Sequence, residues 1–251
     1  MTIGALIITY NEERNIERCI RSVQSFADEI IVLDSFSKDR TPDICRNLGV
    51  KLLQREWAGY AATKNYLNEQ CSCDYLFSID ADEAPDEAMQ QHLIELKSGK
   101  MAGVYSVNRI TNYCGKWIRH SGWFPDIKVR LFPKGSAKWD GELVHEELMV
   151  DSGLKTSTLN GLLQHFSYYD AKEHRQRADK YSELTALKYH QQGKKAGIFK
   201  PCLSGISRFI SMYFLKKGFL DGWRGVQIAW ISALSNVYKY NELRRLNRSS
   251  N

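Results

Sequence analysis

Acidic side chains follow two apolar runs of the sequence, at the points where the runs end. Asp34 closes the run at residues 29–34, and Asp80 and Asp82 come directly after the run at residues 75–79. Carboxylates that are brought together repel one another and need a cation, and Mg²⁺ or Mn²⁺ takes carboxylate and phosphate oxygens in an octahedral array. An Asp-x-Asp pair in a loop is more often a solvated turn. Its position after a buried strand favours a divalent cation site that holds a diphosphate.

Other polar side chains are candidates for binding the phosphates. The sequence has neither a Gly-x-Gly-x-x-Gly pattern nor a Gly-x-x-x-x-Gly-Lys-Ser/Thr pattern, which excludes those two glycine-rich phosphate loops. The metal and individual side chains are left to hold the phosphates. Lys64 and Asn65, on a predicted helix after Gly59, are candidates; the alternative is a surface lysine beside a capping or packing asparagine.

Strand-like and helix-like segments alternate over the first hundred residues. Short apolar runs predict the strands, and each run is followed by apolar residues that recur at helical spacing. The predicted strands are residues 3–9, 29–34, 50–54 and 75–79, and the predicted helices begin near residues 11, 39, 58 and 85. This alternation predicts a parallel, doubly wound sheet, in which ligands bind beyond the carboxyl ends of the strands.

The pattern changes after residue 100. Residues 104–110 and 127–132 alternate apolar and polar residues in places, as half-exposed strands do, and residues 171–245 have mainly helical spacing. We therefore predict an α/β fold with a helical C-terminal segment. Its expected parts are a catalytic domain at 1–170, with a nucleotide-binding half at 1–100 and an acceptor half at 101–170, and a basic, amphipathic helical region at 171–251.

The net charge of +6 is unevenly distributed along the chain. Residues 1–170 have 19 Lys and Arg against 24 Asp and Glu, whereas residues 171–251 have 16 against 5. This distribution does not suit a nucleic-acid binder. It suits a catalytic domain followed by a segment that meets an anionic surface, although a solvated basic helical tail would have the same charge.

Two segments of the basic region have an apolar helical face beside Lys and Arg. They lie at residues 203–214 and 226–237, and neither has the ~20 uninterrupted apolar residues that span a bilayer. Such helices lie in the membrane interface, or the same faces pack against the catalytic domain or a second subunit. The first apolar run has no basic segment before it, which argues against a signal peptide and predicts a cytoplasmic location.

Four motifs occur in a fixed order along the chain. They are Thr9-Tyr-Asn-Glu12, Leu33-Asp-Ser-Phe-Ser-Lys-Asp-Arg-Thr41, Gly59-Tyr-Ala-Ala-Thr-Lys-Asn65 and Asp80-Ala-Asp-Glu83. Together they resemble the signature of family 2 glycosyltransferases, which have the GT-A fold with a doubly wound mixed sheet. The resemblance implies that Thr9 and Glu12 line the nucleotide site, Asp34 contacts the base or ribose, Lys64 lies near the donor, and Asp80 and Asp82 hold ribose and metal. Many relatives have an arginine where Lys64 stands, which leaves its phosphate contact open.

Three further motifs extend the resemblance over nearly the whole chain. They are Trp123-Phe-Pro-Asp-Ile-Lys-Val-Arg-Leu-Phe132, Trp139-Asp-Gly-Glu-Leu-Val-His-Glu146 and Gly218-Phe-Leu-Asp-Gly222. They are similar to those of bacterial lipopolysaccharide core glucosyltransferases of the heptose beta-1,4-glucosyltransferase type. This resemblance implies a UDP-sugar donor, expected to be UDP-glucose. It also implies a lipid-linked saccharide acceptor, such as inner core heptose, at an anionic membrane surface on the cytoplasmic face of the inner membrane.

An inverting transferase needs a carboxylate that deprotonates the acceptor hydroxyl and a metal that neutralises the leaving diphosphate. Glu146 is our candidate for the base, and His145 is a candidate to orient it. His165 is a candidate to complete the shell of a Mg²⁺ or Mn²⁺ ion beside Asp82; the alternative is a core histidine. The competing candidates for the base are Asp140, Glu142 and Glu147.

Three other side chains have two interpretations each. Arg130 is a candidate for a donor or acceptor phosphate contact, or it occupies an exposed position on an edge strand. Trp123 and Trp139 are candidates for stacking on sugar faces, or they pack in the interior.

Rival functions share parts of this pattern. A non-catalytic module that binds sugar nucleotides or glycans would keep the scaffold, and a family 2 transferase for another cell-envelope polysaccharide would keep the same acidic set. A nucleotidyltransferase would share the sheet and the metal, but it would have a glycine-rich, basic first loop where this chain has Thr9-Tyr-Asn-Glu12.

Overall fold

The computed structural model describes residues 1–141 and 147–249. The chain forms two compact units. The first unit comprises Met1–Arg109 and Asp126–Phe166, and the second comprises Ile110–Pro125 and the chain from Ser167 onward. No local pattern in the sequence indicates that residues 110–125 belong with the C-terminal helices.

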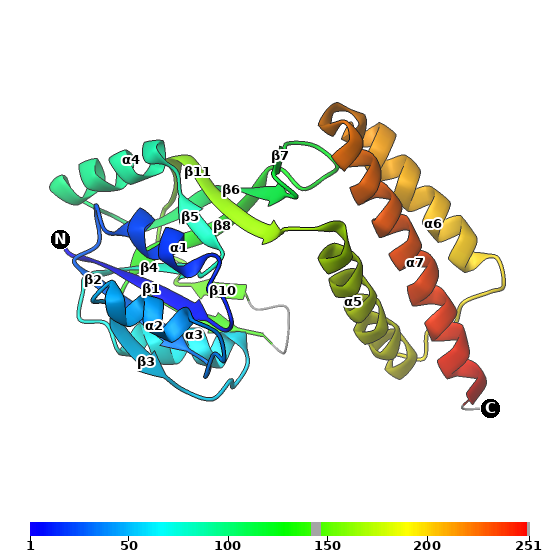
Figure 1. Ribbon diagram of the computed structural model, residues 1–251, viewed down its shortest axis with the longest axis horizontal. Coiled ribbons are helices and arrows are strands. Elements are labelled where there is room, and N and C mark those ends of the chain that lie inside the picture. Colours follow the sequence, from blue (N-terminus) through cyan, green and yellow to red (C-terminus); the bar gives the residue numbers. More distant parts are fainter. Residues whose placement is uncertain (142–146, 250–251) are drawn as a thin grey trace. The chain divides into compact units, whose positions relative to one another are not determined.

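One mixed sheet forms the centre of the first unit (Figure 1). Its strand order over the described residues is β3-β2-β1-β4-β8-β6-β11-β5, and β7, which belongs to the second unit, pairs with the end of β6. The strands on one side are parallel, and those that follow β4 are antiparallel. The strands are β1 (Ile3–Thr9), β2 (Glu29–Asp34), β3 (Lys51–Gln54), β4 (Tyr75–Asp80), β5 (Glu83–Pro85), β6 (Val104–Tyr113), β7 (Lys116–Ile118), β8 (Asp126–Pro133) and β11 (Thr156–Tyr168). The predicted α/β fold with a mixed sheet is confirmed.

Helices cover both faces of this sheet because its parallel strands are apolar on both sides. Ile3, Ala5 and Ile7 of β1 pack in the cluster that includes α1, α2 and α4, whereas Leu6 and Ile8 pack in the cluster that includes α3. The four helices are α1 (Ile16–Val23), α2 (Thr41–Asn47), α3 (Tyr60–Glu69) and α4 (Glu87–Ser98).

The first helix begins later than the sequence predicts. Asn11 has a left-handed backbone (φ 55°) instead of capping a helix, and α1 starts at Ile16. The side-chain oxygen of Asn11 accepts from the amide of Lys38, and its own amide donates to Ser37 Oγ. These bonds keep the segment after β1 in a turn, a conformation that asparagine tolerates better than most residues.

A small two-stranded sheet lies in the same unit. Its antiparallel strands β9 (Ala137–Asp140) and β10 (Glu147–Val150) pair Asp140 opposite Glu147. The chain between these two residues includes Glu142, His145 and Glu146, which lie outside the described residues.

The second unit is mainly helical, as the sequence predicts. Tyr113, Ile118, Met212 and Ile228 form its core, which joins a β-hairpin to the helices. Among the residues that the structure describes, no helix combines the length and the hydropathy of a membrane span. The elements are α5 (Ala171–Gln191), α6 (Lys200–Ile210), the π-helix η1 (Ser211–Leu215), the 3₁₀-helix η2 (Gly218–Asp221) and α7 (Trp223–Ser249).

Asp221 holds the hairpin of the second unit against the helices. Its buried carboxylate accepts hydrogen bonds from the amides of Arg119 and His120 and from the hydroxyl of Ser121. The start of α7 also packs closely against η2. A Cβ at Gly225 would lie 1.8 Å from the carbonyl oxygen of Gly218, so this position requires glycine. The motif Gly218-Phe-Leu-Asp-Gly222 is therefore explained by packing within this unit.

His174 lies in an aromatic cluster of the second unit. Its ring packs against those of Tyr113, Trp123 and Tyr168, with centroids 4.9–5.5 Å away, and its Nδ1 is 3.2 Å from the Tyr113 hydroxyl. Trp123 therefore packs in this cluster. Burial lowers the pKa of His174 to about 4 from its ordinary value of 6.5, because the charged imidazolium would lose its hydration.

We predict that His174 makes the second unit less stable in mild acid. Between pH 6.5 and 4 the unfolded chain binds a proton that the folded chain does not, so stability is complete above pH 6.5 and falls as the pH drops toward 4. The shift corresponds to about 3 kcal/mol. His174→Gln, which keeps a polar partner for Tyr113, should remove this component from urea unfolding measured at pH 7.5 and pH 5. Equal pH dependence in the two proteins would contradict the prediction.

Candidate active site

The parallel strands bring three of the predicted residues to one edge of the sheet. Thr9 pairs with Asp34 across β1 and β2, and Ile8 pairs with Asp80 across β1 and β4, so all three strands end side by side. Thr9 is buried, and among the described residues its hydroxyl has no hydrogen-bond partner. The sheet therefore places two carboxylates and one buried hydroxyl at its carboxyl edge.

Asp34 orders the loop that follows β2. Its carboxylate is fully buried and accepts from the Ser37 amide at 3.1 Å, from the Ser37 hydroxyl, and from Gln54 Nε2 at 2.9 Å. Ser37 in turn accepts from the amide of Asn11 in the loop after β1. Asp34 thus connects the loops after two neighbouring strands.

Glu12 lies in the loop after β1 and is partly buried. Its amide donates to Thr41 Oγ1 at 2.8 Å, and its carboxylate accepts from Asn15 Nδ2 at 2.7 Å. The side chain is therefore anchored at the start of α1, close in sequence to Thr9.

Asp80 forms ion pairs with two buried cations. Its Oδ1 lies 3.0 Å from Lys64 Nζ, and its Oδ2 lies 3.1 Å from a guanidinium nitrogen of Arg130. Burial alone would raise the pKa of Asp80, but Lys64 and Arg130 outweigh it and hold this pKa well below its ordinary value. Lys64, which the sequence places near the donor, is thus beside the carboxylate and not on the surface.

A second buried carboxylate, Glu83, balances the arginines. It accepts from Arg130 at 2.7 Å and from Arg109 at 2.8 Å, and it also accepts from the Asp80 amide at 3.1 Å. Arg109 extends the network to Asp126, 2.6 Å away. Burial alone would lower the pKa of Arg130, but Glu83 and Asp80 outweigh it and raise this pKa above its ordinary value.

Arg130 corrects one sequence-based alternative. The sequence left open an exposed position on an edge strand, but β8 lies between β4 and β6, and Arg130 is buried. Sequence reasoning missed Arg109 and the role of Glu83. The signal was weak: each arginine interrupts an apolar strand, at Val107-Asn-Arg-Ile110 and at Val129-Arg-Leu-Phe132.

Asp82 and His165 lie together at the same edge. The pairing of β5 with β11 sets His165 opposite Glu83, and the Phe166 amide donates to the Asp82 carbonyl oxygen. His165 Nε2 lies 3.2 Å from Asp82 Oδ2, and both side chains are about one-sixth exposed, at 16% and 17%. This carboxylate and imidazole supply two donors of the kinds that divalent cations bind, with room for oxygen ligands from a substrate.

A different cluster of metal-ligand types lies away from this edge. Within the described ranges, Glu29, Cys71 and Cys73 form it, at the amino end of β2. Glu29 already pairs with Lys51 at 3.2 Å and accepts from the Ser72 amide. Burial raises the pKa of the Cys71 thiol to about 12, which disfavours the thiolate that metals bind.

A cavity of about 660 Å³ opens at the N-terminus of α3. Asn65 fixes one of its walls, because its amide side chain donates to the Trp139 carbonyl and accepts from the Trp139 amide. Trp139 lies under Lys64, whose Nζ is 4.5 Å from the ring centroid. Asn65 is thus a packing residue. The cavity is lined by Trp57, Ala58, Gly59, Tyr60, Ala61, Ala62, Asn65, Lys138, Trp139, Asp140 and Gly141.

The candidates for the base have different positions. Asp140 lines the cavity and is exposed, and Glu147 is exposed on the paired strand. Glu142 and Glu146, together with His145, lie outside the residues that the structure describes.

We predict that Glu83→Gln destabilises the first unit by about 3–5 kcal/mol, because it leaves the buried guanidinium of Arg130 and the partly buried one of Arg109 without their shared carboxylate. Urea unfolding at neutral pH measures this change. The control is Glu17→Gln, which breaks an exposed pair with Arg21 and should cost less than about 1 kcal/mol. Similar losses of unfolding free energy in the two variants would show that the buried network contributes no more to stability than an exposed ion pair.

Comparisons with known proteins identify the family of the chain. A model of the family described as glycosyl transferase family 2 matches residues 5–156. An uncharacterized glycosyltransferase of Rickettsia bellii is 30% identical, over 99% of this chain and 88% of that protein. The lipopolysaccharide core biosynthesis glycosyltransferase LpsC of Rhizobium meliloti is 28% identical, over 97% of this chain and 94% of LpsC.

Among solved structures, glucosyl-3-phosphoglycerate synthase of Mycobacterium tuberculosis in complex with Mn²⁺, UDP and glucosyl-3-phosphoglycerate is 26% identical. The match covers 45% of this chain and 44% of that one, with a TM-score of 0.37. The assignment therefore rests on sequence, where the family model covers more than half of the chain and one relative matches nearly all of it. On these grounds the chain belongs to glycosyl transferase family 2.

Proposed function

We propose that this family 2 enzyme transfers glucose from UDP-glucose to a lipid-linked saccharide, such as inner core heptose of lipopolysaccharide, with inversion at the anomeric carbon. One observation supports it above the others: Thr9, Asp34 and Asp80 end three adjacent strands, and the same edge bears Asp82 and His165, 3.2 Å apart. The name of the Rhizobium relative supports the choice of acceptor.

The nucleotide would bind along the loops after β1 and β2. Thr9 would offer its buried hydroxyl, and Glu12 would line the same pocket. Asp34 is occupied by Ser37 and Gln54, so we propose that it acts at the base or ribose chiefly by holding the loop that borders them. Lys64 and Asp80 would form the floor near the ribose and diphosphate.

Asp82 and His165 fit a divalent cation. Their adjacent oxygen and nitrogen donors are partly exposed, and two protein ligands leave positions for phosphate oxygens and water, as Mg²⁺ and Mn²⁺ require. When bound there, such a cation would neutralise the diphosphate that leaves. Asp80 is a weaker ligand candidate, because Lys64 and Arg130 already neutralise it.

The acceptor hydroxyl needs a base, and we propose Glu146 for this role. It follows a strand whose last residues line the cavity beside α3, and it precedes Glu147 on β10. Asp140, Glu142 and Glu147 lie in or beside the same segment and remain the alternatives.

We also propose that the two parts of the chain have different roles. Residues 1–170 would include the catalytic residues, and residues 171–251 would meet an anionic membrane surface, at the cytoplasmic face of the inner membrane. The charge supports this, because the C-terminal region has 16 Lys and Arg against 5 Asp and Glu.

We predict that Asp82→Ala lowers turnover of UDP-glucose by about a thousandfold or more, because the cation loses its carboxylate ligand. The assay is transfer to purified lipopolysaccharide core acceptors with Mn²⁺ or Mg²⁺, read by mass spectrometry.

His165→Ala should raise the Mn²⁺ concentration needed for half-maximal rate. Asp43→Ala, on the exposed surface of α2, is the control that should keep full activity. Donor binding without transfer or hydrolysis by the wild-type chain would instead indicate a binding module.

We predict that Glu146→Gln lowers kcat by about 10²–10⁴-fold, since it removes the general base, while binding of UDP-glucose is retained. Parallel variants Asp140→Asn, Glu142→Gln and Glu147→Gln should lower kcat far less. Steady-state kinetics and donor titration separate the two effects. A larger loss in any of the three parallel variants would reassign the base.

A further inference from the structure

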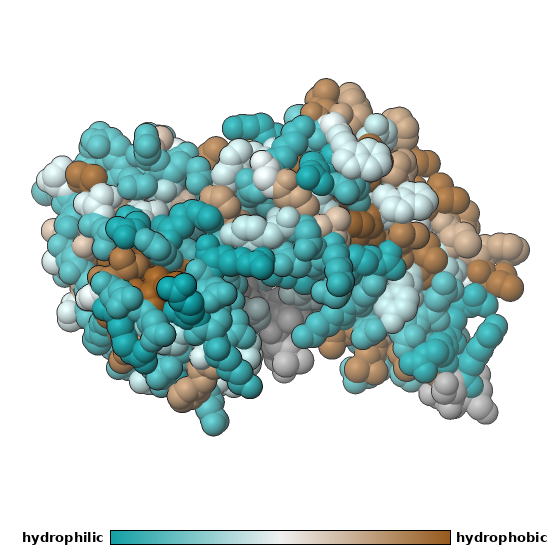
Figure 2. Space-filling model, in the orientation of Figure 1, coloured by the Kyte–Doolittle hydropathy of each residue, from teal (hydrophilic) through white to brown (hydrophobic). Residues whose placement is uncertain are grey.

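An exposed apolar stripe runs along one side of α6 and η1. We call it the α6 face and define it by Phe199, Leu203, Ile206, Ile210 and Phe214, whose spacing of three or four residues places them on one side of a helix. They are 45–74% exposed. More exposed apolar side chains follow in the sequence, at the end of η1, on η2 and at the start of α7, and Figure 2 shows hydrophobic residues gathered over the C-terminal helices. They are Leu215, Phe219, Leu220 and Trp223.

The opposite side of α6 already packs within the second unit. A Cβ at Gly205 would lie 2.6 Å from Val237 Cγ2 and 3.2 Å from the Ala233 carbonyl oxygen, both on α7. Pro201 and Met212 are buried on this inner side. The core of the second unit is therefore complete without the α6 face. A contiguous set of exposed apolar side chains of this kind indicates an interaction surface.

The segment that bears the α6 face is rich in positive charge. From Glu183 to Asp221 the sequence has seven Lys and Arg residues and no acidic residue between those two. Asp221 itself is buried and bonded to the hairpin. Lys200 and Arg208 lie on α6, and Lys216 and Lys217 follow η1. This charge pattern favours an anionic partner.

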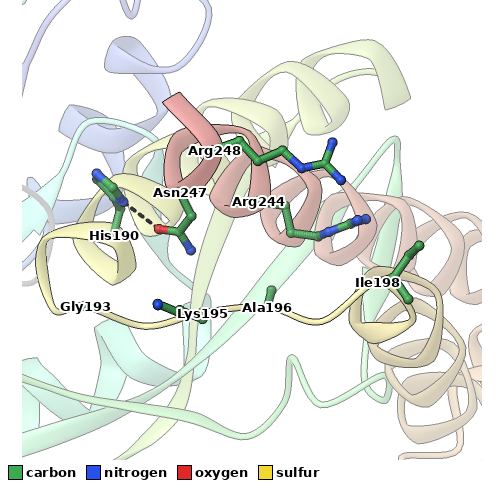
Figure 3. Close-up of a pocket in the computed structure, with 8 residues that line it drawn as sticks. All are labelled: His190, Gly193, Lys195, Ala196, Ile198, Arg244, Asn247 and Arg248. Carbon is green, nitrogen blue, oxygen red and sulfur yellow. Dashed lines mark hydrogen bonds between the residues drawn. The ribbon is translucent and has the colours of Figure 1, made fainter. Parts of the chain in front are cut away.

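A basic cavity of about 410 Å³ lies at the N-terminal end of the α6 face (Figure 3). Lys195, Arg244 and Arg248 line it together with Ile198, and no acidic side chain is among its lining residues. In the described part of the chain, these three cations have no carboxylate within ion-pair distance. His190 Nδ1 lies 2.7 Å from Asn247 Oδ1, and Asn247 donates to the Lys194 carbonyl, so the cavity wall is braced.

We propose that the second unit docks on a bilayer of anionic phospholipid. The α6 face enters the boundary between headgroups and acyl chains, and the basic cavity takes the phosphate of one headgroup through Lys195, Arg244 and Arg248. Apolar residues beside Lys and Arg are the composition of interfacial helices. A second copy of this chain fits less well, because two α6 faces in contact would bring together two segments, residues 184–220, that each have seven Lys and Arg and no Asp or Glu.

The inference deepens the proposed function and rests on it for the membrane partner, yet it is tested without any sugar nucleotide. Co-sedimentation of the full chain with vesicles of phosphatidylcholine alone, or mixed with phosphatidylglycerol, measures binding. We expect binding to the mixed vesicles only, weakened by salt. Leu203→Glu combined with Ile206→Glu should reduce it by more than about tenfold. Ile94→Glu, the same change at an exposed position of α4 in the first unit, should leave it intact.

A second pair of variants tests the basic cavity. Arg244→Gln combined with Arg248→Gln should weaken binding about fivefold for each cation removed. The matched control is Arg245→Gln, whose side chain pairs with Glu242 and does not line the cavity, so its loss should be smaller. Inorganic phosphate at millimolar concentration should not displace the chain from vesicles, because the apolar contacts persist.

Three results would overturn the inference. The first is a folded wild-type chain that does not bind mixed vesicles, and the second is equal binding to phosphatidylcholine alone. The third is a dimer in analytical ultracentrifugation that Leu203→Glu with Ile206→Glu dissociates, without vesicle binding by the wild type. Transfer to a water-soluble acceptor fragment should survive all of these substitutions. If the chain binds vesicles as expected but transfers sugar to no acceptor, the proposed function is wrong and the inference of a docking surface is retained.

Discussion

The shared carboxylate of Glu83 is the constraint on which the first unit depends. Buried Arg130 and partly buried Arg109, which belong to different strands, both donate to it, and its second oxygen accepts a hydrogen bond from the amide of Asp80. Without this charge, Arg109 would be left with Asp126 as its carboxylate partner, and Arg130 would be left with Asp80. The network therefore holds the end of β4 in place, and the chain then turns so that Asp82 reaches His165.

Local pattern was enough to predict the strands and where they end. The runs at residues 3–9, 29–34 and 75–79 became β1, β2 and β4 with nearly the same bounds, because buried parallel strands are continuous apolar segments. Their parallel pairing then brings Thr9, Asp34 and Asp80 to one edge. The family, too, could be recognised from motifs at these strand ends.

Long-range pairing accounts for what the sequence did not reveal. Arg109 and Arg130 look like exposed positions until β8 is known to lie between β4 and β6, and no local pattern states that order. Asn11 reads as a helix cap, yet its partners Ser37 and Lys38 lie on another loop. Trp123 resembles a sugar-stacking residue, but it joins a ring cluster whose other members are distant in the sequence, such as His174.

The hairpin at residues 110–125 means that the polypeptide passes between the two units three times, after Arg109, Pro125 and Phe166. Tyr113 and Ile118 find their buried neighbours, Met212 and Ile228, only in the C-terminal helices. A chain shortened to its first 170 residues would keep this hairpin but lose its covering, and it would present aromatic surface to solvent. The first 170 residues therefore lack the buried residues of the C-terminal helices against which their hairpin packs.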